Sequence, residues 1–330
     1  MLLHKPIAST NGHSPVQATR KRGYGKVDPP FGYFGSKNKI ALQIINKLPP
    51  HNAWVEAFCG SAAVTLAKPP TPIEVINDID DQITNLFTQL RENQQELIRQ
   101  ISLTPYAREE LNLARNVNGA ISDLERARKF LVASMMSING ILGEDRGGFS
   151  YSLSFVRNGH EARVSRWYNL PERLSQVVER LRHALIEKKD ARKLLETFID
   201  RPATLVYLDP PYFVERTNGY NVDANTEVFH KELLELANKA KCMIFISGYD
   251  NKLYKSLLTR QKGWTRRSIP THTKDPHGKI HSRTEVLWMN RYFQLASKSS
   301  KAPIRLSSKE KEENKINPKR PVATLKNKGC

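Results

Sequence analysis

The stretch Leu205-Val206-Tyr207-Leu208-Asp209-Pro210-Pro211-Tyr212 decides how the rest of the chain is interpreted. Residues 205–208 are apolar β-formers that follow a turn at Arg201-Pro202, so they predict a buried strand. Two consecutive prolines lack backbone donors and have a fixed φ, so the strand ends at Asp209. The Asp209 carboxylate therefore stands at the carboxyl end of a strand, with an aromatic ring three residues later. On these eight residues alone, a ligand site and a solvated Asp in a Pro-rich turn are equally good interpretations.

Alternating strands and helices flank this stretch and predict an open α/β sheet. A strand at residues 53–58 leads into the turn Phe58-Cys59-Gly60-Ser61, a helix, and a second strand at 73–76. That order is a βαβ unit, which implies a parallel sheet. A further strand at 243–246 and a hairpin of strands at 264–271 and 284–289 follow later in the chain. Ligands of open α/β sheets bind outside the carboxyl ends of the strands, where Asp209 stands.

Helical periodicity appears in several other segments. Apolar spacing predicts helices at about 40–48, 83–101, 123–137, 172–186, 233–237 and 251–258, with another short element at 190–198. Between 139 and 167 no period survives, and we expect loops with short strands there. Arg, Asn, Ser, Tyr and Gly are interleaved in this segment, which suits contacts in a nucleic-acid groove. A solvated connector is the alternative interpretation. The candidate DNA contacts are Arg146, Arg157, Asn158 and Arg163.

Composition limits the class of protein. Hydrophobic residues make up 39% of the 330 residues and the mean hydropathy is −0.53. No apolar run reaches the roughly 18 residues that span a bilayer, and the N-terminus lacks the apolar core of a signal peptide. Three cysteines and nine scattered histidines give neither a disulfide framework nor a metal-binding spacing. We therefore expect a cytoplasmic protein with no metal and no membrane contact.

The net charge of +19 is concentrated towards the two ends of the chain. Residues 298–330 hold ten Lys and Arg against three Glu, and residues 1–27 hold five without an acid. The ends therefore carry +7 and +5, which leaves +7 for the body between them. A basic body favours a polyanionic partner such as nucleic acid. The extensions, 1–28 and 296–330, are expected to be disordered, and a solubilising role is the simpler interpretation of them.

Two segments upstream supply candidate ligand-binding residues. Small residues after the first strand let a ligand approach the backbone at Gly60, although the absence of Gly-x-Gly-x-x-Gly excludes the dinucleotide fingerprint. Glu56, just before this turn, is costly to bury unless it accepts hydrogen bonds. Asp78 ends the second strand, the usual position of a carboxylate that holds ribose hydroxyls. Capping the next helix is the alternative, and Asp80 suits that role equally well. Lys37 could reach a carboxylate across the same crevice, although an isolated lysine is usually a surface residue.

Four motifs, taken in their order along the chain, resemble those of the Dam-like DNA adenine-N6 methyltransferases of the Asp-Pro-Pro-Tyr type. The resemblance covers about residues 30–292. Asp-Pro-Pro-Tyr alone is moderately specific, whereas all four motifs in this order are strongly specific. Segments 247–250 and 284–286 are similar to later family elements. Two departures are Ser36, where Gly-Gly is usual, and Ser61-Ala62, where glycines are frequent, and we expect any effect in cofactor affinity. The four motifs are Tyr33-Phe34-Gly35-Ser36-Lys37, Glu56-Ala57-Phe58-Cys59-Gly60-Ser61, Asn77-Asp78-Ile79-Asp80 and Asp209-Pro210-Pro211-Tyr212.

The resemblance implies an α/β fold and a cofactor. The fold is a doubly wound, mostly parallel seven-stranded S-adenosylmethionine-dependent methyltransferase (Rossmann-like) sheet with an inserted, mainly helical target-recognition domain. The catalytic domain is expected at 29–80 and 168–295, and the inserted DNA-binding domain at 81–167. The residues expected around S-adenosylmethionine are Tyr33, Gly35, Lys37, Glu56, Phe58, Gly60, Asp78 and, at the adenine ring of the cofactor, Asp190.

The implied activity is site-specific methylation of adenine N6 in double-stranded DNA. The target base leaves the duplex, Tyr212 stacks on it, and the Asp209 carboxylate and Pro210 carbonyl accept hydrogen bonds from its amino group. The alternatives are an amino-group methyltransferase acting on cytosine N4, RNA or a protein glutamine, and a DNA-binding relative without catalysis. Asp209 and the Arg-rich insertion favour DNA adenine. A prokaryotic or phage origin is expected, with a cognate restriction endonuclease as an optional partner.

Overall fold

The computed structural model describes residues 26–33, 36–116, 119–138, 147–157, 159–211, 226–274, 280–302 and 312. At its centre is a seven-stranded sheet with the order β5-β2-β1-β6-β7-β9-β8. Five neighbouring strands pair in parallel, namely β5, β2, β1, β6 and β7. Strands β8 and β9 form an antiparallel hairpin, and β9 pairs antiparallel with β7. This confirms the expected doubly wound, mostly parallel sheet. The strands are β1 (Ala53–Glu56), β2 (Ile73–Asn77), β5 (Leu185–Glu187), β6 (Thr204–Leu208), β7 (Met243–Gly248), β8 (Thr265–Lys274) and β9 (Ile280–Met289).

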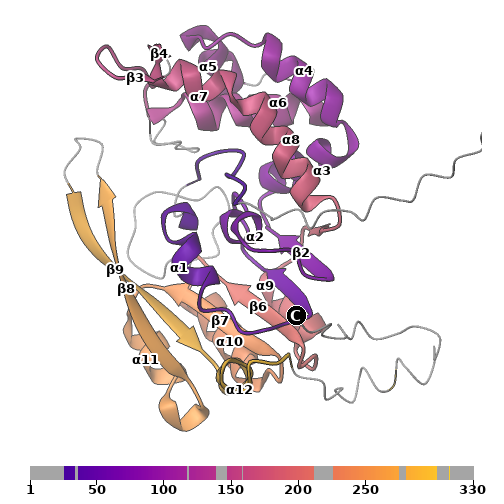
Figure 1. Cartoon of the computed structure of the whole chain (residues 1–330), viewed down its shortest axis with the longest axis vertical. Helices are drawn as coiled ribbons and strands as arrows, with labels where there is room; N and C mark the ends of the chain where they lie inside the picture. Colours follow the sequence, from indigo (N-terminus) through magenta and orange to yellow (C-terminus); the bar gives the residue numbers. More distant parts are fainter. Residues whose placement is uncertain are drawn as a thin grey trace, which may run out of the picture.

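Helices cover both faces of the sheet, and the side chains of β6 alternate between the two faces (Figure 1). Leu205 and Tyr207 lie in a core cluster with residues of α1 (Ala41–Ile45) and α12 (Arg291–Ser299). Val206 and Leu208 lie in the opposite cluster with residues of α9 (Ala191–Phe198), α10 (Glu227–Lys239) and α11 (Lys252–Leu257). A strand buried on both faces reads as a continuous apolar run, which is why residues 205–208 were recognisable from the sequence.

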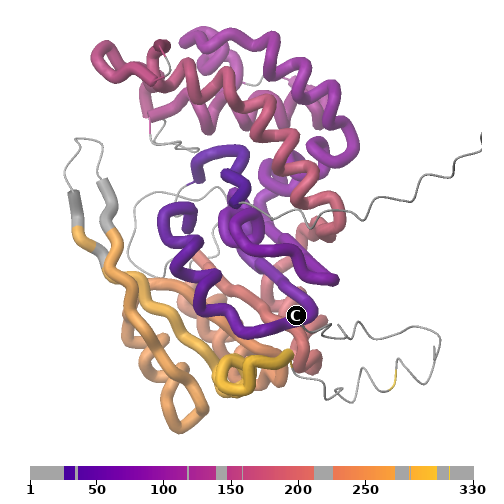
Figure 2. The backbone as a smooth tube through the Cα atoms, in the orientation of Figure 1, coloured from indigo at the N-terminus to yellow at the C-terminus, as the bar shows by residue number. Residues whose placement is uncertain are grey.

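A group of helices lies between β2 and β5 in the chain and gathers at one end of the sheet (Figure 1). Its members share one apolar core with Ile76 of β2 and with α2 (Ala63–Ala67). The first described segment, residues 26–33, runs between this group and the sheet (Figure 2). The ring of Phe31 packs edge-on against that of Phe130, with 4.9 Å between the ring centroids. The elements are α3 (Asp81–Glu92), α4 (Gln94–Leu103), α5 (Arg108–Arg115), α6 (Asp123–Met136), β3 (Val156–Arg157), β4 (His160–Glu161), α7 (Ala162–Tyr168) and α8 (Leu170–Leu181).

Several elements differ from the sequence expectation. The helix expected at 83–101 is divided into α3 and α4, and α5 was not expected. The helix expected at 172–186 ends at Leu181, and its last residues form the edge strand β5, which is only three residues long and partly exposed. Helix α7 occupies part of the segment expected to be loops and short strands; its N-terminus is capped by Glu161, which accepts from the backbone N–H groups of Arg163 and Val164. Helix α12 continues past Leu295, where the composition changes, because Ala296 is buried in the core.

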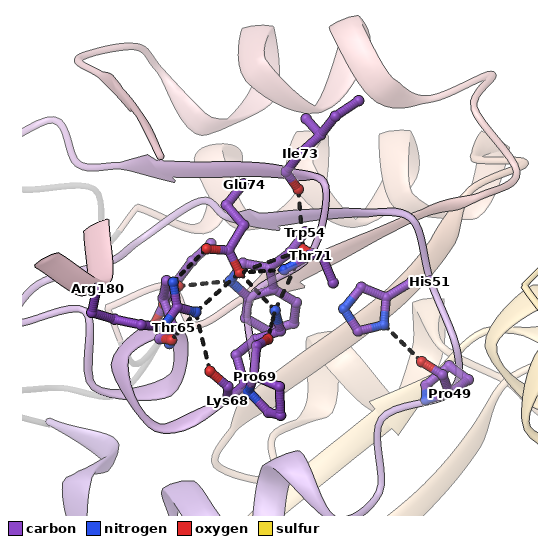
Figure 3. A network of polar contacts seen from close by, with 11 residues as sticks. Pro49, His51, Trp54, Thr65, Lys68, Pro69, Thr71, Ile73, Glu74 and Arg180 are labelled. Atoms are coloured by element: carbon purple, nitrogen blue, oxygen red, sulfur yellow. Dashed lines mark hydrogen bonds and ion pairs between the residues drawn. The ribbon is translucent and has the colours of Figure 1, made fainter. Parts of the chain in front are cut away.

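A buried polar network joins α2 and the start of β2 to α8 (Figure 3). Arg180 donates to both carboxylate oxygens of Glu74, at 2.5 and 3.0 Å, and to the carbonyls of Thr65 and Lys68, at 2.7 and 3.1 Å. The ammonium of Lys68 lies 2.8 Å from Glu74. Burial raises the pKa of Glu74, but the donors outweigh it and hold the pKa below its ordinary value. The network therefore anchors the helical group at the amino end of β2, opposite the end that carries Asp78.

Among the helices that the structure describes, none has the length and apolarity required to cross a membrane.

Candidate active site

Asp209 follows the last residue of β6 and is held by donors from two other segments. The ammonium of Lys37 lies 2.7 Å from Oδ1 of Asp209. The hydroxyl of Ser247, on the neighbouring strand β7, donates to the same oxygen at 2.8 Å, and the Tyr207 hydroxyl lies 2.7 Å from the Ser247 hydroxyl. Within the described part of the chain, Oδ2 of Asp209 has no hydrogen-bond donor. The carboxylate is thus fixed through one oxygen and offers the other as an acceptor.

Lys37 is a buried cation between two carboxylates. It belongs to the 3₁₀ turn η1 (Lys37–Lys39), is only 6% exposed, and also lies 3.7 Å from Oε1 of the buried Glu285 on β9. Burial lowers the pKa of Lys37, but the charges of Asp209 and Glu285 outweigh it and hold the pKa above its ordinary value. Lys37 is therefore a charged donor to Asp209. The expectation that Lys37 reaches a carboxylate across the crevice is confirmed.

The turn after β1 faces the end of β2. The backbone N–H of Gly60 donates to Oδ2 of Asp78 at 2.8 Å, and the N–H of Asp80 donates to Oδ1 at 3.0 Å. The side chain of Asp80 caps α3 by accepting from the N–H of Gln82. Asp80 is therefore the helix cap, and Asp78 joins the Gly60 turn to the segment that follows β2. Burial raises the pKa of Asp78 to about 6, because desolvation outweighs its two backbone donors.

Glu56 is buried at the end of β1, and it accepts the hydrogen bonds that a buried carboxyl requires. It accepts hydrogen bonds from the backbone N–H of Thr65, at 2.9 Å, and from the Thr65 hydroxyl. The indole N–H of Trp54 donates to the same hydroxyl at 2.6 Å. Burial nevertheless dominates and raises the pKa of Glu56 to about 7. Two carboxyls whose pKa values are raised by burial, Glu56 and the half-buried Asp78, therefore stand at the carboxyl ends of β1 and β2.

Tyr33 closes the turn that a cofactor would approach. Gly60 has a φ of +47°, and a Cβ added there would lie 2.9 Å from the Tyr33 ring, so only glycine fits this position. Ala62, where the family often has glycine, adopts a φ of +55° in the same turn. The ring of Tyr33 therefore packs directly on the backbone of this turn, which a residue with a side chain at position 60 would prevent.

A cavity of about 350 Å³ lies beyond the carboxyl ends of β1 and β2. Phe58, Asp190 and Phe229 line it, with the rings of Phe58 and Phe229 edge-to-face at 6.2 Å. Asp190 caps α9 and pairs with Arg192, whose guanidinium lies 4.8 Å from the centroid of the Phe229 ring. Aromatic walls beside a carboxylate fit a planar ring that bears an amino group. The residues of this crevice therefore fit the cofactor S-adenosylmethionine.

Family membership follows from the sequence between Tyr33 and Ile269. These residues match the family of D12 class N6 adenine-specific DNA methyltransferases, residues 33–269 of the chain. The chain belongs to this family. The D12-class protein is a DNA adenine-N6 methyltransferase that uses S-adenosylmethionine. A comparison with curated proteins returned no match.

Several solved structures are similar to the D12-class methyltransferase. The precorrin-8W decarboxylase of Methanobacterium thermoautotrophicum is 10% identical, with a TM-score of 0.34, and the match covers 80% of this chain and 98% of that one. The precorrin-6Y C5,15-methyltransferase of Geobacter metallireducens is 9% identical, with a TM-score of 0.35 and coverage of 79% and 98%. The rRNA methyltransferase AviRa of Streptomyces viridochromogenes is 13% identical, with a TM-score of 0.33 and coverage of 82% and 90%.

The other residues expected in the site of the D12-class methyltransferase are placed as follows. Pro210 is buried directly after Asp209, whereas Arg157 on β3 and Arg163 on α7 are exposed on the helical group. Gly35, Arg146, Asn158 and Tyr212 lie outside the described residues. Among the described residues, no group of His, Cys, Asp and Glu side chains is arranged to hold a metal ion. Sequence reasoning missed the roles of Tyr207 and Ser247. The signal for Tyr207 was its position near the end of a predicted strand, and Ser247 also begins segment 247–250, which is similar to a later family element.

The two segments of the D12-class methyltransferase that depart from the family pattern contact each other through Ser36 and Ser61. The hydroxyl of Ser36 lies 3.0 Å from the hydroxyl of the buried Ser61, which joins the Lys37 segment to the Gly60 turn. We expect Ser36→Ala and Ser61→Ala each to weaken S-adenosylmethionine binding by about fivefold, since one such hydrogen bond contributes about 1 kcal/mol. The double variant should lose no more than either single one, and calorimetric titration measures this coupling.

Ser175→Ala serves as the matched control for these variants. Ser175 is exposed on α8, and its hydroxyl donates to a carbonyl of its own helix at 3.1 Å. Its removal should leave cofactor affinity unchanged. Additive losses in the double variant Ser36→Ala/Ser61→Ala would show that the two hydroxyls act independently.

Burial of Glu56 should make the stability of the D12-class methyltransferase depend on pH. The folded carboxyl keeps its proton up to about pH 7, whereas its ordinary pKa is 4.5. Between these values the folded state binds more protons than the unfolded state, so the free energy of unfolding falls as pH rises and stays lower above pH 7. We expect Glu56→Gln to unfold like the parent near about pH 5 and to be about 2–3 kcal/mol more stable near about pH 8.

Urea unfolding at the two pH values measures this difference. Glu172→Gln, on the exposed face of α8, controls for the loss of a carboxylate at the surface and should show no such change with pH. A difference between parent and Glu56→Gln that is the same at both pH values would contradict the assignment.

Proposed function

We propose that Asp209 is the acceptor that aims the N6 amino group of a target adenine at the methyl donor. The observation that carries the proposal is the asymmetric bonding of its carboxylate, in which Lys37 and Ser247 occupy Oδ1 and leave Oδ2 available. The Pro210 carbonyl follows directly and is proposed as the second acceptor. The adenine amino group has two hydrogens, and Oδ2 of Asp209 and the Pro210 carbonyl would each accept one of them.

The reaction then needs alignment more than proton transfer. S-adenosylmethionine supplies a methyl group on a positively charged sulfur, which is already an activated leaving group. Accepting both amine hydrogens directs electron density to the nitrogen and points its lone pair away from Asp209. The amine nitrogen would take the methyl group, the sulfur would keep the electron pair of the carbon–sulfur bond, and the proton of the methylated amine would pass through Oδ2 of Asp209 to solvent. The rate gain comes from orientation and electrostatics, and no covalent enzyme intermediate forms.

We further propose that the target adenine is flipped out of double-stranded DNA, because a paired base cannot reach a carboxylate at the end of a buried strand. Residues 81–167 are proposed as the target-recognition domain, with the catalytic domain formed by 29–80 and 168–295. The exposed Arg157 and Arg163 support a DNA contact on that group of helices. Arg146 and Asn158 are proposed to contact the DNA beside them, and Tyr212 to stack on the flipped base.

We also propose the cellular setting of this activity. The chain is expected to act in the cytoplasm of a prokaryote or of a phage-infected cell. A cognate restriction endonuclease is an optional partner, because the proposed methylation chemistry requires no second protein.

Nucleoside analysis tests the proposed function directly. Duplex DNA is incubated with the chain and with S-adenosylmethionine carrying a deuterated methyl group, then digested and analysed by mass spectrometry. The expected product is N6-methyladenine with the deuterated methyl group. Labelled N4-methylcytosine, or label in an RNA substrate instead of DNA, would assign a different amino-group acceptor. Binding of DNA without any labelled product would identify a relative that has lost catalysis.

A further inference from the structure

Two arginines lie half-buried where the helical group meets the segment that carries Tyr33. Arg166 is in the last turn of α7 and Arg173 is in the first half of α8. The guanidinium of Arg173 donates to the backbone carbonyl of Arg166 at 3.2 Å, and the charge of Arg166 lowers the pKa of Arg173, so the two guanidinium groups are neighbours. A Cβ added to Gly32 would lie 3.5 Å from Nη2 of Arg166, so this guanidinium rests against the backbone next to Tyr33.

The positive charge of this pair is not neutralised by a direct ion pair. Among the described residues, neither guanidinium forms a salt bridge, and Arg166 has no hydrogen-bond acceptor for its guanidinium. Burial lowers the pKa of both arginines, and each is lowered further by a neighbouring arginine, Arg166 by Arg163 and Arg173 by Arg166. The charge of the Asp28 carboxylate raises the pKa of both arginines. This carboxylate is exposed and lies 3.4 Å from the ammonium of Lys26.

Buried arginines are normally paired, because desolvating a guanidinium without a partner is costly. An anion that binds beside the two guanidinium groups offsets the free energy lost in desolvating them. The rigid fork of arginine matches the oxygens of a phosphate, and two forks side by side hold it more specifically than one lysine. Arg163 lies one helical turn before Arg166 on the same face of α7 and is exposed, so positive charge extends from the pair to the surface.

We propose that Arg166 and Arg173 form a phosphate-binding site for the DNA backbone beside the entrance to the active site. The inference rests on the proposed function, because DNA is the polyanion that this protein must hold against its cofactor crevice. The location supports it, since Tyr33 covers the Gly60 turn and Arg166 touches the backbone of the preceding residue. A phosphate held there would fix the register of the DNA strand without reading its sequence.

The salt dependence of DNA binding tests the site. Arg166→Gln, Arg173→Gln and the double variant are titrated with a fluorescein-labelled DNA duplex at increasing KCl. Each lost phosphate contact should reduce the slope of log K against log salt by about 0.9, for duplexes of different sequence alike. The double variant Arg166→Lys/Arg173→Lys keeps the charge and should retain most of the slope. Affinity for S-adenosylmethionine, measured by calorimetry without DNA, should not change.

Arg182→Gln is the matched control, because this arginine lies just after α8 and is 69% exposed, 3.9 Å from Glu179. It should leave both the slope and the melting temperature unchanged. The Gln variants of Arg166 and Arg173 should melt at or above the temperature of the parent, since an unneutralised charge has been removed. An unchanged slope, a lower melting temperature or a weaker cofactor affinity would each overturn the proposal. A parent that does not methylate DNA would instead refute the proposed function, so the two failures are distinguishable.

Discussion

Replacing Asp209 with asparagine is expected to lower kcat for DNA methylation by roughly three orders of magnitude. The amide can keep its oxygen towards the donors Lys37 and Ser247, which lie 2.7 and 2.8 Å from Oδ1 in the parent. Its NH₂ group then takes the place of Oδ2 and presents a donor to the adenine amine, which is itself a donor. The other orientation of the amide places NH₂ against the Lys37 ammonium. This second orientation would return an oxygen to the place of Oδ2, but it sets the donors Lys37 and Ser247 against an NH₂ group. The first orientation is therefore favoured, and it lacks the acceptor that aims the nitrogen lone pair.

Single-turnover methylation of duplex DNA measures this loss, with cofactor affinity and thermal melting recorded for the same variant. Asp250→Asn is the matched control, because Asp250 follows the neighbouring strand and pairs at the surface with Lys255 and Arg266, at 3.2 and 3.3 Å. The control should methylate at the parental rate. Asp209→Asn should still bind S-adenosylmethionine, with a change below about tenfold. Methylation by Asp209→Asn within about tenfold of the parent would remove Asp209 from the catalytic role.

Replacing Arg180 with methionine is expected to lower the free energy of unfolding by about 3 kcal/mol or more. The Arg180 side chain is 2% exposed and forms four hydrogen bonds, two to Glu74 and two to the backbone at the end of α2 (Figure 3). Methionine fills the volume of the stem but leaves the buried Glu74 carboxylate with Lys68 as its remaining cation, at 2.8 Å. The carbonyls of Thr65 and Lys68 also lose their donor in a buried place.

Urea unfolding followed by circular dichroism gives this free energy. Arg182→Met replaces an exposed arginine two residues later, and its effect should stay within about 0.5 kcal/mol. Methyl transfer by Arg180→Met, measured well below its unfolding transition, should remain close to the parental rate, because the network lies at the end of the sheet away from Asp209. Equal unfolding free energies for Arg180→Met and Arg182→Met would show that the network does not stabilise the fold.

Most of the sheet could be predicted from the sequence because its strands are buried on both faces. The runs at 205–208 and 243–246 are apolar throughout, and those at 53–58 and 73–76 are each interrupted by one glutamate, Glu56 or Glu74. Short apolar runs of this kind between turn residues are typical of buried strands. Strand β5 could not be predicted, since it has three residues at a sheet edge and exists through pairing with β2. Helix α7 was also missed, because its apolar stripe is short and its capping residue is a glutamate.

Some features of the active site could likewise be predicted from the sequence, and others could not. The position of Asp209 at a strand end followed from two prolines, and Asp78 followed from its place after the second strand. The choice between Asp78 and Asp80 as helix cap needed coordinates, because both side chains stand close to the start of α3. The contact between Ser36 and Ser61 could not be foreseen either, although both residues had been noted as departures from the family pattern.

By itself, the sequence determined the family, the parallel sheet and the residue types at the ends of β1, β2 and β6. Local patterns encode these features, because strand periodicity and proline stereochemistry act over a few residues. Only the tertiary structure decided that Lys37 and Ser247 hold one oxygen of Asp209, and that Arg166 and Arg173 lack a carboxylate partner within the described residues. These facts join segments that are far apart in the chain. They depend on the order β1-β6-β7-β9 and on the packing of α7 and α8, which no local pattern specifies.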